Sequence, residues 1–304
     1  MLIDSRVSEV LSKVRVVELA TIGKDSSPQV RPMSAIWVPG KGHIVLTTPL
    51  AFPQKVFNIR RDGRVSLFYS DLTGSGLDGK TAVLVQGTAD APQIAAGSAE
   101  LEDFWSATFS RNPEYATQFA SPGYRATMDW YYWRLPIYVT PERVHVFDAT
   151  PVGGVLEPPP PSAVPMAEQI RDAIERYPTA VLTAFDDQGH PYSVRAEVSA
   201  DLRVRPLQPF DGKPGRASLL WHRHSLGAGG DTSSMLTLQV IGSFDGERFT
   251  AERVPGALPD ERGAGGGEYD WVARAKQQSA AYLAKRGLAE PVVDWDALAG
   301  YTTP

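Results

Sequence analysis

The sequence contains no cysteine in 304 residues, which excludes disulfide bonds, thiolate metal sites and a cysteine nucleophile and fits a reducing cytoplasm. No apolar run approaches the roughly 20 residues of a membrane-spanning helix, and the first residues lack the apolar core of a signal peptide. Lysine and arginine form no cluster, and the net charge of −5 argues against nucleic-acid binding. We therefore expect a soluble, cytoplasmic protein with no nucleic-acid or membrane partner.

Motifs for hydrolytic or metal chemistry are also scarce. The sequence has no His-Glu-x-x-His, no Gly-x-Ser-x-Gly and no triad order. His222 and His224 lie two apart on a predicted strand, a spacing that can bind a metal or haem, but no third ligand is near. We favour a solvated or core-edge histidine pair. No metal site is predicted, and the catalytic residues stay unassigned.

A glycine-rich segment at residues 74–81 matches the phosphate-binding P-loop letter for letter. A P-loop works only where a helix follows, because the helix N-terminus supplies the N–H groups that hold the phosphate. Here the β-branched, alternating residues 81–89 follow and predict a strand. We interpret the segment as a hairpin loop, with a P-loop nucleotide binder as the least favoured alternative.

A proline-rich segment at residues 151–165, with four consecutive prolines from Pro158 to Pro161, divides the chain. Such a run favours extended polyproline conformation and cannot form a core. We predict a domain over residues 1–150, a semi-rigid linker over 151–165 and a second domain over 166–304. This division suits a chain that is long enough for two cores.

Strand patterns dominate the first domain. Apolar alternation and β-branched residues predict strands, and helical spacing with capping residues predicts helices. The predicted strands are 16–22, 29–38, 43–48, 64–70, 81–89, 131–138 and 143–147, the last two around a turn at Pro141, and the predicted helices are one that Asp4 or Ser5 caps, 53–61 and 98–119.

The second domain repeats this pattern in outline. Three segments of the first domain have counterparts in the same order, which chance does not favour. Helices are predicted at 166–177 and 269–286, the latter ended by Gly287. Between Leu202 and Arg216 the repeat has no Thr-Thr pair and no Gln-Lys helix. The repeated pairs are 19–22 with 27–31 and 181–185 with 189–195, 64–69 and 216–221, and 83–87 and 236–242.

Residues 44–61 have the features of a phosphate site. A strand ends in Thr47 and Thr48, and the next helix carries Gln54 and Lys55 in its first turn. Free N–H groups at a helix start favour an anion, and an adjacent cation and hydroxyl groups strengthen this preference. The ordinary alternative is a strand end followed by a solvated lysine, which we favour less.

Arg31 is the second candidate cation. Strand alternation places it on one face with Met33, Ala35 and Trp37, which costs free energy unless an anion or a carboxylate meets it. We favour a shared phosphate over a structural carboxylate. A cluster of aromatic residues and arginines is either core packing or a wall for a flat, conjugated ligand; its members are Tyr124, Arg125, Trp130, Tyr131, Tyr132, Trp133 and Arg134.

These segments together resemble the FMN-binding split-barrel superfamily, the pyridoxamine 5′-phosphate oxidase-like proteins. Residues 20–33 look like its first hairpin, 44–67 like its phosphate strand and helix, 83–87 like its next strand, and 134–144 like its closing strands. The resemblance implies a mainly β (α+β) fold. It predicts two split β-barrels with short flanking helices, joined by the proline-rich linker, with the second barrel degenerate.

The resemblance also implies a set of cofactor-binding residues. Thr48, Gln54 and Lys55 would hold the flavin phosphate and ribityl chain together with Arg31. The backbone of the three residues after Arg31 would line the ring edge, Thr47 would lie beside the ring, and Gln86 would contact the ring or the phosphate. The full set is Arg31, Pro32, Met33, Ser34, Thr47, Thr48, Gln54, Lys55 and Gln86.

The implied function is that of an FMN-dependent oxidoreductase that acts on a small molecule by hydride transfer through flavin N5. The alternatives are a reductase that uses the deazaflavin F-420, and a non-catalytic flavin- or haem-binding protein. The arginine-rich C-terminal signature of true pyridoxamine phosphate oxidases is absent, so vitamin B6 oxidation is not implied. Family members place the flavin between two barrels of a dimer, so the chain forms either a homodimer or an internal pseudo-dimer.

Overall fold

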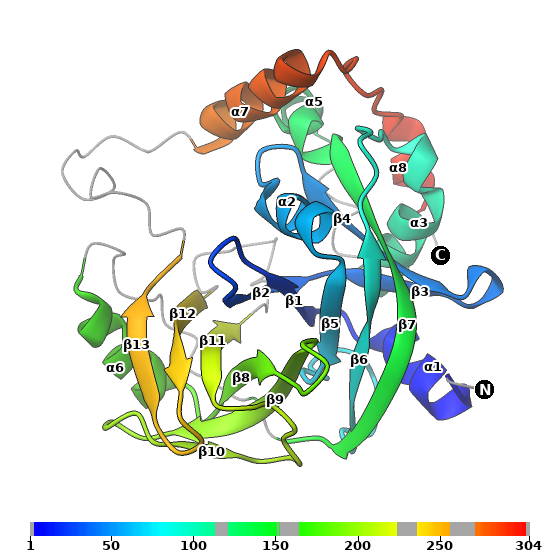
Figure 1. The fold of residues 1–304 in the computed structure, drawn as a ribbon. Helices are drawn as coiled ribbons and strands as arrows, with labels where there is room; N and C mark the ends of the chain where they lie inside the picture. Colours follow the sequence, from blue (N-terminus) through cyan, green and yellow to red (C-terminus); the bar gives the residue numbers. More distant parts are fainter. Residues whose placement is uncertain are drawn as a thin grey trace.

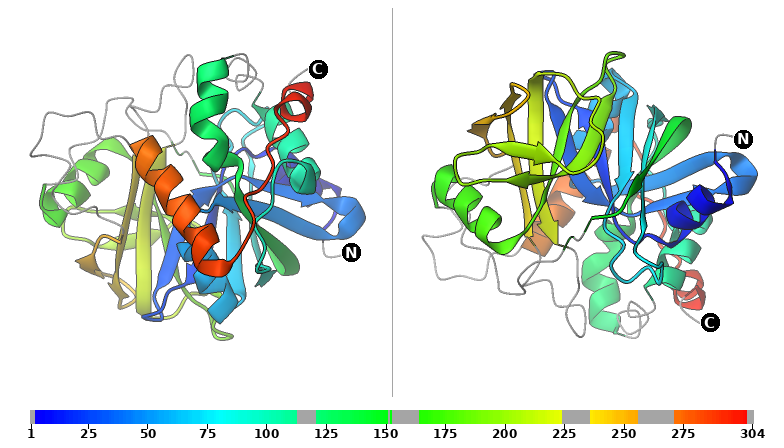
Figure 2. Two further views of the ribbon diagram at one scale, coloured as in Figure 1. Left: turned by 90° about the horizontal axis from the view of Figure 1, so that it is seen from above. Right: turned by 90° about the horizontal axis from the view of Figure 1, so that it is seen from below.

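The computed structural model describes residues 3–112, 121–150, 152, 164–223, 236–255 and 271–301. Two curled antiparallel sheets pack face to face, and helices surround them (Figures 1 and 2). Most of the predicted linker, residues 113–119 of the predicted helix 98–119, and His224 lie outside the described residues.

The first sheet has seven strands in the order β2-β1-β5-β6-β7-β4-β3. Asp4 caps the first helix by accepting a hydrogen bond of 2.8 Å from the Val7 N–H, as predicted. The elements of this half are α1 (Ser5–Lys13), β1 (Val17–Ile22), β2 (Pro28–Met33), β3 (Ala35–Val38), β4 (His43–Pro49), α2 (Gln54–Arg61), β5 (Arg64–Tyr69), β6 (Thr81–Asp90), α3 (Glu102–Arg111), α5 (Pro122–Met128) and β7 (Arg134–Asp148).

Three sequence predictions in this half are wrong. The predicted strand 29–38 breaks at Ser34 into β2 and β3, which lie at opposite edges of the sheet because they pair with β1 and β4 respectively. The alternation that begins at Arg31 therefore does not continue through Trp37. No turn occurs at Pro141: β7 runs through it, and a bulge at Gln86/Gly87 absorbs the irregularity. Residues 129–132 form a 3₁₀ turn instead of starting a strand.

The second sheet has the order β10-β9-β8-β11-β12-β13. Its five strands β9-β8-β11-β12-β13 follow the same order as β2-β1-β5-β6-β7, which supports the predicted repeat. Residues 207–214, between β10 and β11, contain no helix, so the counterpart of α2 is missing, as predicted. The elements are α6 (Met166–Arg176), β8 (Ala180–Phe185), β9 (Pro191–Val198), β10 (Val204–Pro206), β11 (Gly215–Arg223), β12 (Leu236–Phe244) and β13 (Phe249–Arg253).

The two sheets share a hydrophobic core. Phe68 and Leu84 of the first sheet belong to one buried cluster with Leu220 and Val240 of the second. Burial from both sides explains why these strands are almost continuously apolar. The two sheets are therefore two layers around one common core.

The C-terminal helices return to the first half. The helix α7 (Trp271–Arg286) packs on α2, with the rings of Tyr282 and Phe57 stacked at 6.3 Å between centroids (Figure 2). The short helix α8 (Trp295–Gly300) buries Leu298 against a cluster that includes Trp105 of α3. The predicted second domain, residues 166–304, is therefore divided. Its strands form the second sheet, whereas α7 and α8 pack on elements of the first half.

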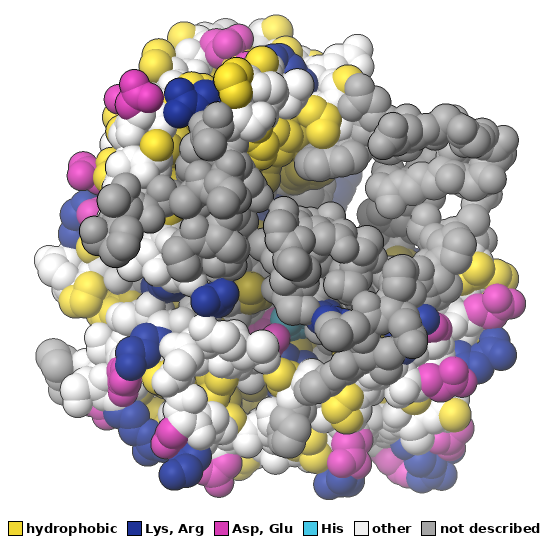
Figure 3. Space-filling model, turned by 180° about the vertical axis from the view of Figure 1, so that it is seen from behind, with side chains coloured by type: hydrophobic (Ala, Val, Ile, Leu, Met, Phe, Trp, Pro, Cys, Tyr) yellow, Lys and Arg dark blue, Asp and Glu magenta, His cyan; other side chains and the backbone are white. Residues whose placement is uncertain are grey.

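The described surface carries mixed charge. On the face seen in Figure 3, lysine and arginine side chains are interspersed with aspartate and glutamate. Within the described part of the chain, no helix is long and apolar enough to cross a membrane.

Candidate anion and cofactor site

The start of α2 brings a lysine against the end of β4. Lys55 Nζ donates hydrogen bonds to Thr48 Oγ1 at 2.9 Å and to the Phe52 carbonyl at 3.3 Å. Thr48 Oγ1 in turn donates to the Phe52 carbonyl at 3.1 Å. All of these acceptors are neutral oxygens, so the contacts orient the amine without cancelling its charge.

Two arginines place further positive charge near Lys55. Arg31 of β2 donates to the Val30 carbonyl at 3.0 Å, the Pro255 carbonyl at 3.2 Å and the Gln239 Oε1. Arg134, the first residue of β7, is only 5% exposed, and its Nε has no hydrogen-bond partner. Among the residues that the structure describes, no carboxylate forms an ion pair with Arg31, Lys55 or Arg134. We call these three side chains the cation cluster.

The charge of the cation cluster is costly without an anion. Burial and the positive charges of Arg31 and Arg134 lower the pKa of Lys55 to about 7, and burial also lowers the pKa of Arg31. Desolvation and like charges both disfavour the protonated amine. A phosphate between these groups would provide the missing negative charge and accept their hydrogen bonds. The donor set therefore fits the phosphate of a flavin.

Arg134 packs against aromatic rings. The Arg134 guanidinium lies 4.9 Å from the centre of the Trp105 ring and 4.3 Å from that of the Tyr131 ring. Trp130, Tyr132 and Trp133 are buried in the hydrophobic clusters. Of the two readings of the aromatic cluster, the observed contacts are those of core packing around Arg134.

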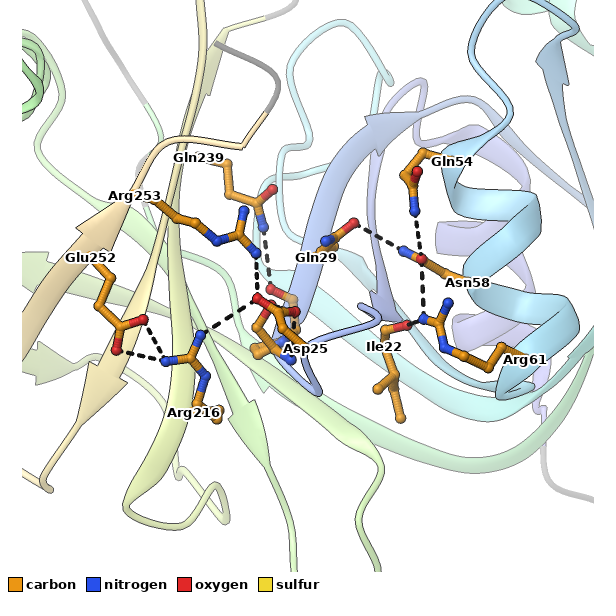
Figure 4. Close-up of polar contacts among 12 residues, drawn as sticks. Ile22, Asp25, Gln29, Gln54, Asn58, Arg61, Arg216, Gln239, Glu252 and Arg253 are labelled. Carbon is orange, nitrogen blue, oxygen red and sulfur yellow. Dashed lines mark hydrogen bonds and ion pairs between the residues drawn. The ribbon is translucent and has the colours of Figure 1, made fainter.

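A buried asparagine fixes α2 on the β1–β2 hairpin. Asn58, which is fully buried, donates to Thr21 Oγ1 and Gln29 Oε1, both at 3.0 Å. Its Oδ1 accepts from Gln54 Nε2 at 3.0 Å (Figure 4). The chain of contacts ties the first turn of α2 to the strand that carries Arg31. Asn58 thus holds the helix that carries Lys55 against the strand that carries Arg31.

The predicted site residues are only partly brought together. Lys55 contacts Thr48, Arg31 lies near enough to lower the pKa of Lys55, and Gln54 is the neighbour of Lys55 in the first turn of α2. Thr47 is buried, points to the opposite face of β4, and its Oγ1 has no hydrogen-bond partner. The half-buried residues Pro32, Met33 and Ser34 directly follow Arg31.

Gln86 makes its contacts elsewhere. Its Nε2 donates to Asp186 Oδ2 at 3.0 Å and to the Pro191 carbonyl at 2.9 Å, and its Oε1 lies 3.2 Å from His145 Nε2. The side chain is thus engaged with the second sheet and with β7. Contact with a flavin stays a prediction for this residue.

Sequence reasoning missed Arg134 and Gln239 as members of this neighbourhood. Arg134 was grouped with the aromatic residues because its sequence neighbours are aromatic. Its proximity to Lys55 arises from the pairing of β7 with β4, in which Arg134 lies opposite Pro49. Such a residue could be found from the sequence by asking which strand pairs with the strand that ends in Thr47 and Thr48, and which residue begins it.

Two competing motifs have structural roles. Residues 74–81 lead into β6 and not into a helix, and the exposed Lys80 lies 3.7 Å from Asp78, which confirms the hairpin loop. His222 is fully buried at the side chain, with its Nε2 2.8 Å from Glu18 Oε1. In the described parts of the chain, no group of three or more His, Cys, Asp or Glu side chains is placed to hold a metal ion.

The two curled antiparallel sheets define a split-barrel fold, and the cation cluster lies in its first half. Residues 3–148 match the family model for pyridoxamine 5′-phosphate oxidase. This segment, a little under half of the chain, is a pyridoxamine 5′-phosphate oxidase-like split-barrel region.

Solved structures match about half of the chain, and no curated protein matches it. A conserved hypothetical protein from Mycobacterium tuberculosis is 24% identical, covering 50% of this chain and 92% of that chain at a TM-score of 0.36. A FAD-binding protein from Mesorhizobium loti is 20% identical, covering 48% and 93% at 0.33. An F420 reductase is 18% identical, covering 45% and 94% at 0.29. At these scores the three structures carry no argument about function.

Proposed function

We propose that the cation cluster binds the phosphate of FMN and that the protein is an FMN-dependent oxidoreductase acting on a small molecule. The observation that carries the proposal is the convergence of Arg31, Lys55 and Arg134 without a carboxylate partner among the described residues. It occurs in the segment that matches the pyridoxamine 5′-phosphate oxidase family. Positive charge that is at least half-buried and has no counter-charge is unfavourable unless a ligand supplies one.

When bound, FMN would supply hydride transfer through its N5 atom. The side chains described here bind and orient the cofactor. Lys55, held by Thr48, and Arg31 would contact the phosphate, while Arg134 adds positive charge from β7. Because the Lys55 pKa is near 7, a dianionic phosphate would favour the protonated amine, which takes its proton from solvent and keeps it at Nζ.

The two sheets would take the place of the two barrels of a dimer. Gln239 Nε2 donates to the Pro28 carbonyl at 3.3 Å, and Gln86 Nε2 donates to the Pro191 carbonyl at 2.9 Å. Pro28 and Pro191 are the first residues of the corresponding strands β2 and β9. Reciprocal contacts of this kind are the mark of a two-fold interface. An internal pseudo-dimer with one phosphate site predicts one FMN per chain.

The test is cofactor identity followed by affinity. Mass analysis of the molecule released on denaturation separates FMN from the deazaflavin F-420 and from haem. For protein freed of cofactor, Lys55→Met and Arg31→Met should each weaken FMN binding at least about tenfold, as expected for a charge-assisted hydrogen bond. Lys80→Met, in the exposed β5–β6 loop, should leave FMN affinity unchanged. A protein that neither contains nor binds a flavin would refute the proposal.

A further inference from the structure

A glutamine of the second sheet contacts Arg31. Gln239 of β12 is 1% exposed; its Oε1 accepts a hydrogen bond from Arg31 Nη1, and its Nε2 donates to the Pro28 carbonyl at 3.3 Å. Figure 4 shows Gln239 reaching from the second sheet toward the β1–β2 hairpin. The Gln239 amide thus forms hydrogen bonds with both the backbone of β2 and the guanidinium group of Arg31.

Most of the support for Arg31 comes from the second half of the chain. Of its three acceptors, Gln239 Oε1 and the Pro255 carbonyl belong to that half, and the third is the carbonyl of the adjacent Val30. These bonds use both Nη1 hydrogens and one at Nη2. The Nε–H and one Nη2–H remain for a further acceptor, since a guanidinium group has five N–H donors.

The neutral character of the contact matters. A carboxylate at position 239 would hold Arg31 equally well but would cancel its charge, whereas an amide orients the guanidinium and leaves it positive. A long arginine side chain that nothing holds loses rotamer entropy when it binds an anion. Orientation before binding removes part of that cost.

We propose that Gln239 is a positioning residue, supplied by the degenerate second half, that orients Arg31 toward the phosphate of the flavin. The inference rests on the proposed function, because it concerns the same site. It assigns the second half a role in cofactor affinity beyond covering the first sheet.

The experiment compares FMN with riboflavin, which lacks the phosphate. For each variant, the ratio of the riboflavin to the FMN dissociation constant isolates the contribution of the phosphate from general loosening of the fold. Gln239→Met keeps the length of the side chain but removes both hydrogen bonds. We expect its ratio to fall about tenfold below that of the wild-type protein, since hydrogen bonds to charged groups are worth roughly that factor.

Asp25→Asn is the matched control. Asp25 joins the same hairpin to the second sheet through Arg253, at 2.5 Å, and Arg216, at 3.6 Å (Figure 4), and within the described residues it does not contact Arg31. Its substitution weakens the junction between the halves, so a purely structural effect would appear in both variants. We expect the ratio of Asp25→Asn to stay at the wild-type value.

Gln239→Glu keeps an acceptor at the same place but adds a negative charge beside Arg31. Its ratio should fall further than that of Gln239→Met, by about a hundredfold in total, and it serves if the methionine variant fails to fold. A wild-type protein that does not prefer FMN to riboflavin would refute the proposed phosphate site itself. A wild-type preference that survives both substitutions at position 239 would overturn only the role of Gln239.

Discussion

Lys55 combines a helix-start position with an environment that disfavours its charge. Its amine contacts only neutral oxygens, and Arg31 and Arg134 lie close enough to contribute to the lowering of its pKa to about 7. Unfolded, the same amine would titrate near 10.4. Between these two values the unfolded chain binds more protons than the folded one, so this group makes the ligand-free protein more stable as the pH rises. A bound anion would favour the protonated amine and so raise the pKa of Lys55.

The pH dependence of FMN binding follows from this residue. We expect the dissociation constant to increase about fiftyfold between pH 7 and pH 9, because binding requires one proton that Lys55, with a pKa of about 7, has lost at the higher pH. The phosphate itself is already dianionic across this range. Calorimetry in buffers of different ionisation enthalpy measures the proton taken up.

Lys55→Arg provides the control for this prediction. Its guanidinium group stays charged throughout the range, so the affinity should become nearly independent of pH. An equal pH dependence in the wild-type protein and in Lys55→Arg would show that another group titrates.

At the scale of elements, the two hairpins β1–β2 and β8–β9 show why a sequence repeat need not repeat a site. Pro28 pairs with Ile22, and Pro191 pairs with Phe185. Counting from these prolines, Val194 corresponds to Arg31, and Arg195 comes one position later. A shift of one residue moves a side chain to the other face of a strand. Arg195 accordingly meets the buried Glu18 at 2.9 Å and not a ligand.

Two glycines mark the same bulge in both sheets. A Cβ on Gly87 would lie 2.1 Å from the Thr140 carbonyl oxygen, and one on Gly242 would lie 1.9 Å from the Thr250 carbonyl oxygen. Both contacts are with backbone, which cannot rotate away. Each glycine therefore permits close approach of the next strand at its bulge.

Alanine at these bulges should be strongly destabilising. We expect Gly87→Ala and Gly242→Ala each to lower the free energy of unfolding by about 2–4 kcal/mol, because the strands must separate to admit the methyl group. Gly40→Ala, where a Cβ would meet nothing within 4 Å, should leave it nearly unchanged. Urea denaturation measures all three variants, and an undisturbed Gly242→Ala would show that the second bulge relaxes freely.

At the scale of the whole molecule, a buried polar cluster joins the two sheets. Glu18 Oε1 accepts hydrogen bonds from Ser70 Oγ at 2.8 Å and Arg195 at 2.9 Å, and it lies 2.8 Å from His222 Nε2. Glu18 is fully buried, and Arg195 is 2% exposed. The cluster requires both sheets in place, because each sheet supplies one of the two opposite charges.

Removal of Glu18 should therefore weaken the whole structure. Glu18→Ala leaves Arg195 buried without its counter-charge, and we expect a loss of about 3–5 kcal/mol in the free energy of unfolding. Glu197→Gln, in an exposed pair with Arg205, should have no measurable effect. The expected result is a single denaturation transition at lower urea, since the sheets share one core. Two separate transitions in the wild-type protein would contradict this view of the halves.

Local patterns determined most elements of this protein. The capped first helix, the helix after Thr47 and Thr48, the helix ended by Gly287 and the strand after the false P-loop all follow from residues adjacent in the chain. Helix caps and side-chain periodicity act within a few residues, so a single sequence is sufficient to predict them. The presence of a β repeat without its Gln-Lys helix was likewise visible in the sequence.

Tertiary structure alone decided which residues meet. The break at Ser34, the engagement of Gln86 by Asp186 and Pro191, and the placing of Arg134 near Lys55 depend on strand pairings and on packing between the sheets. Arg31 and Gln239 are more than 200 positions apart and touch only because the sheets pack face to face. Local propensity carries no information on such contacts, because they are selected by burial and charge summed over the whole fold.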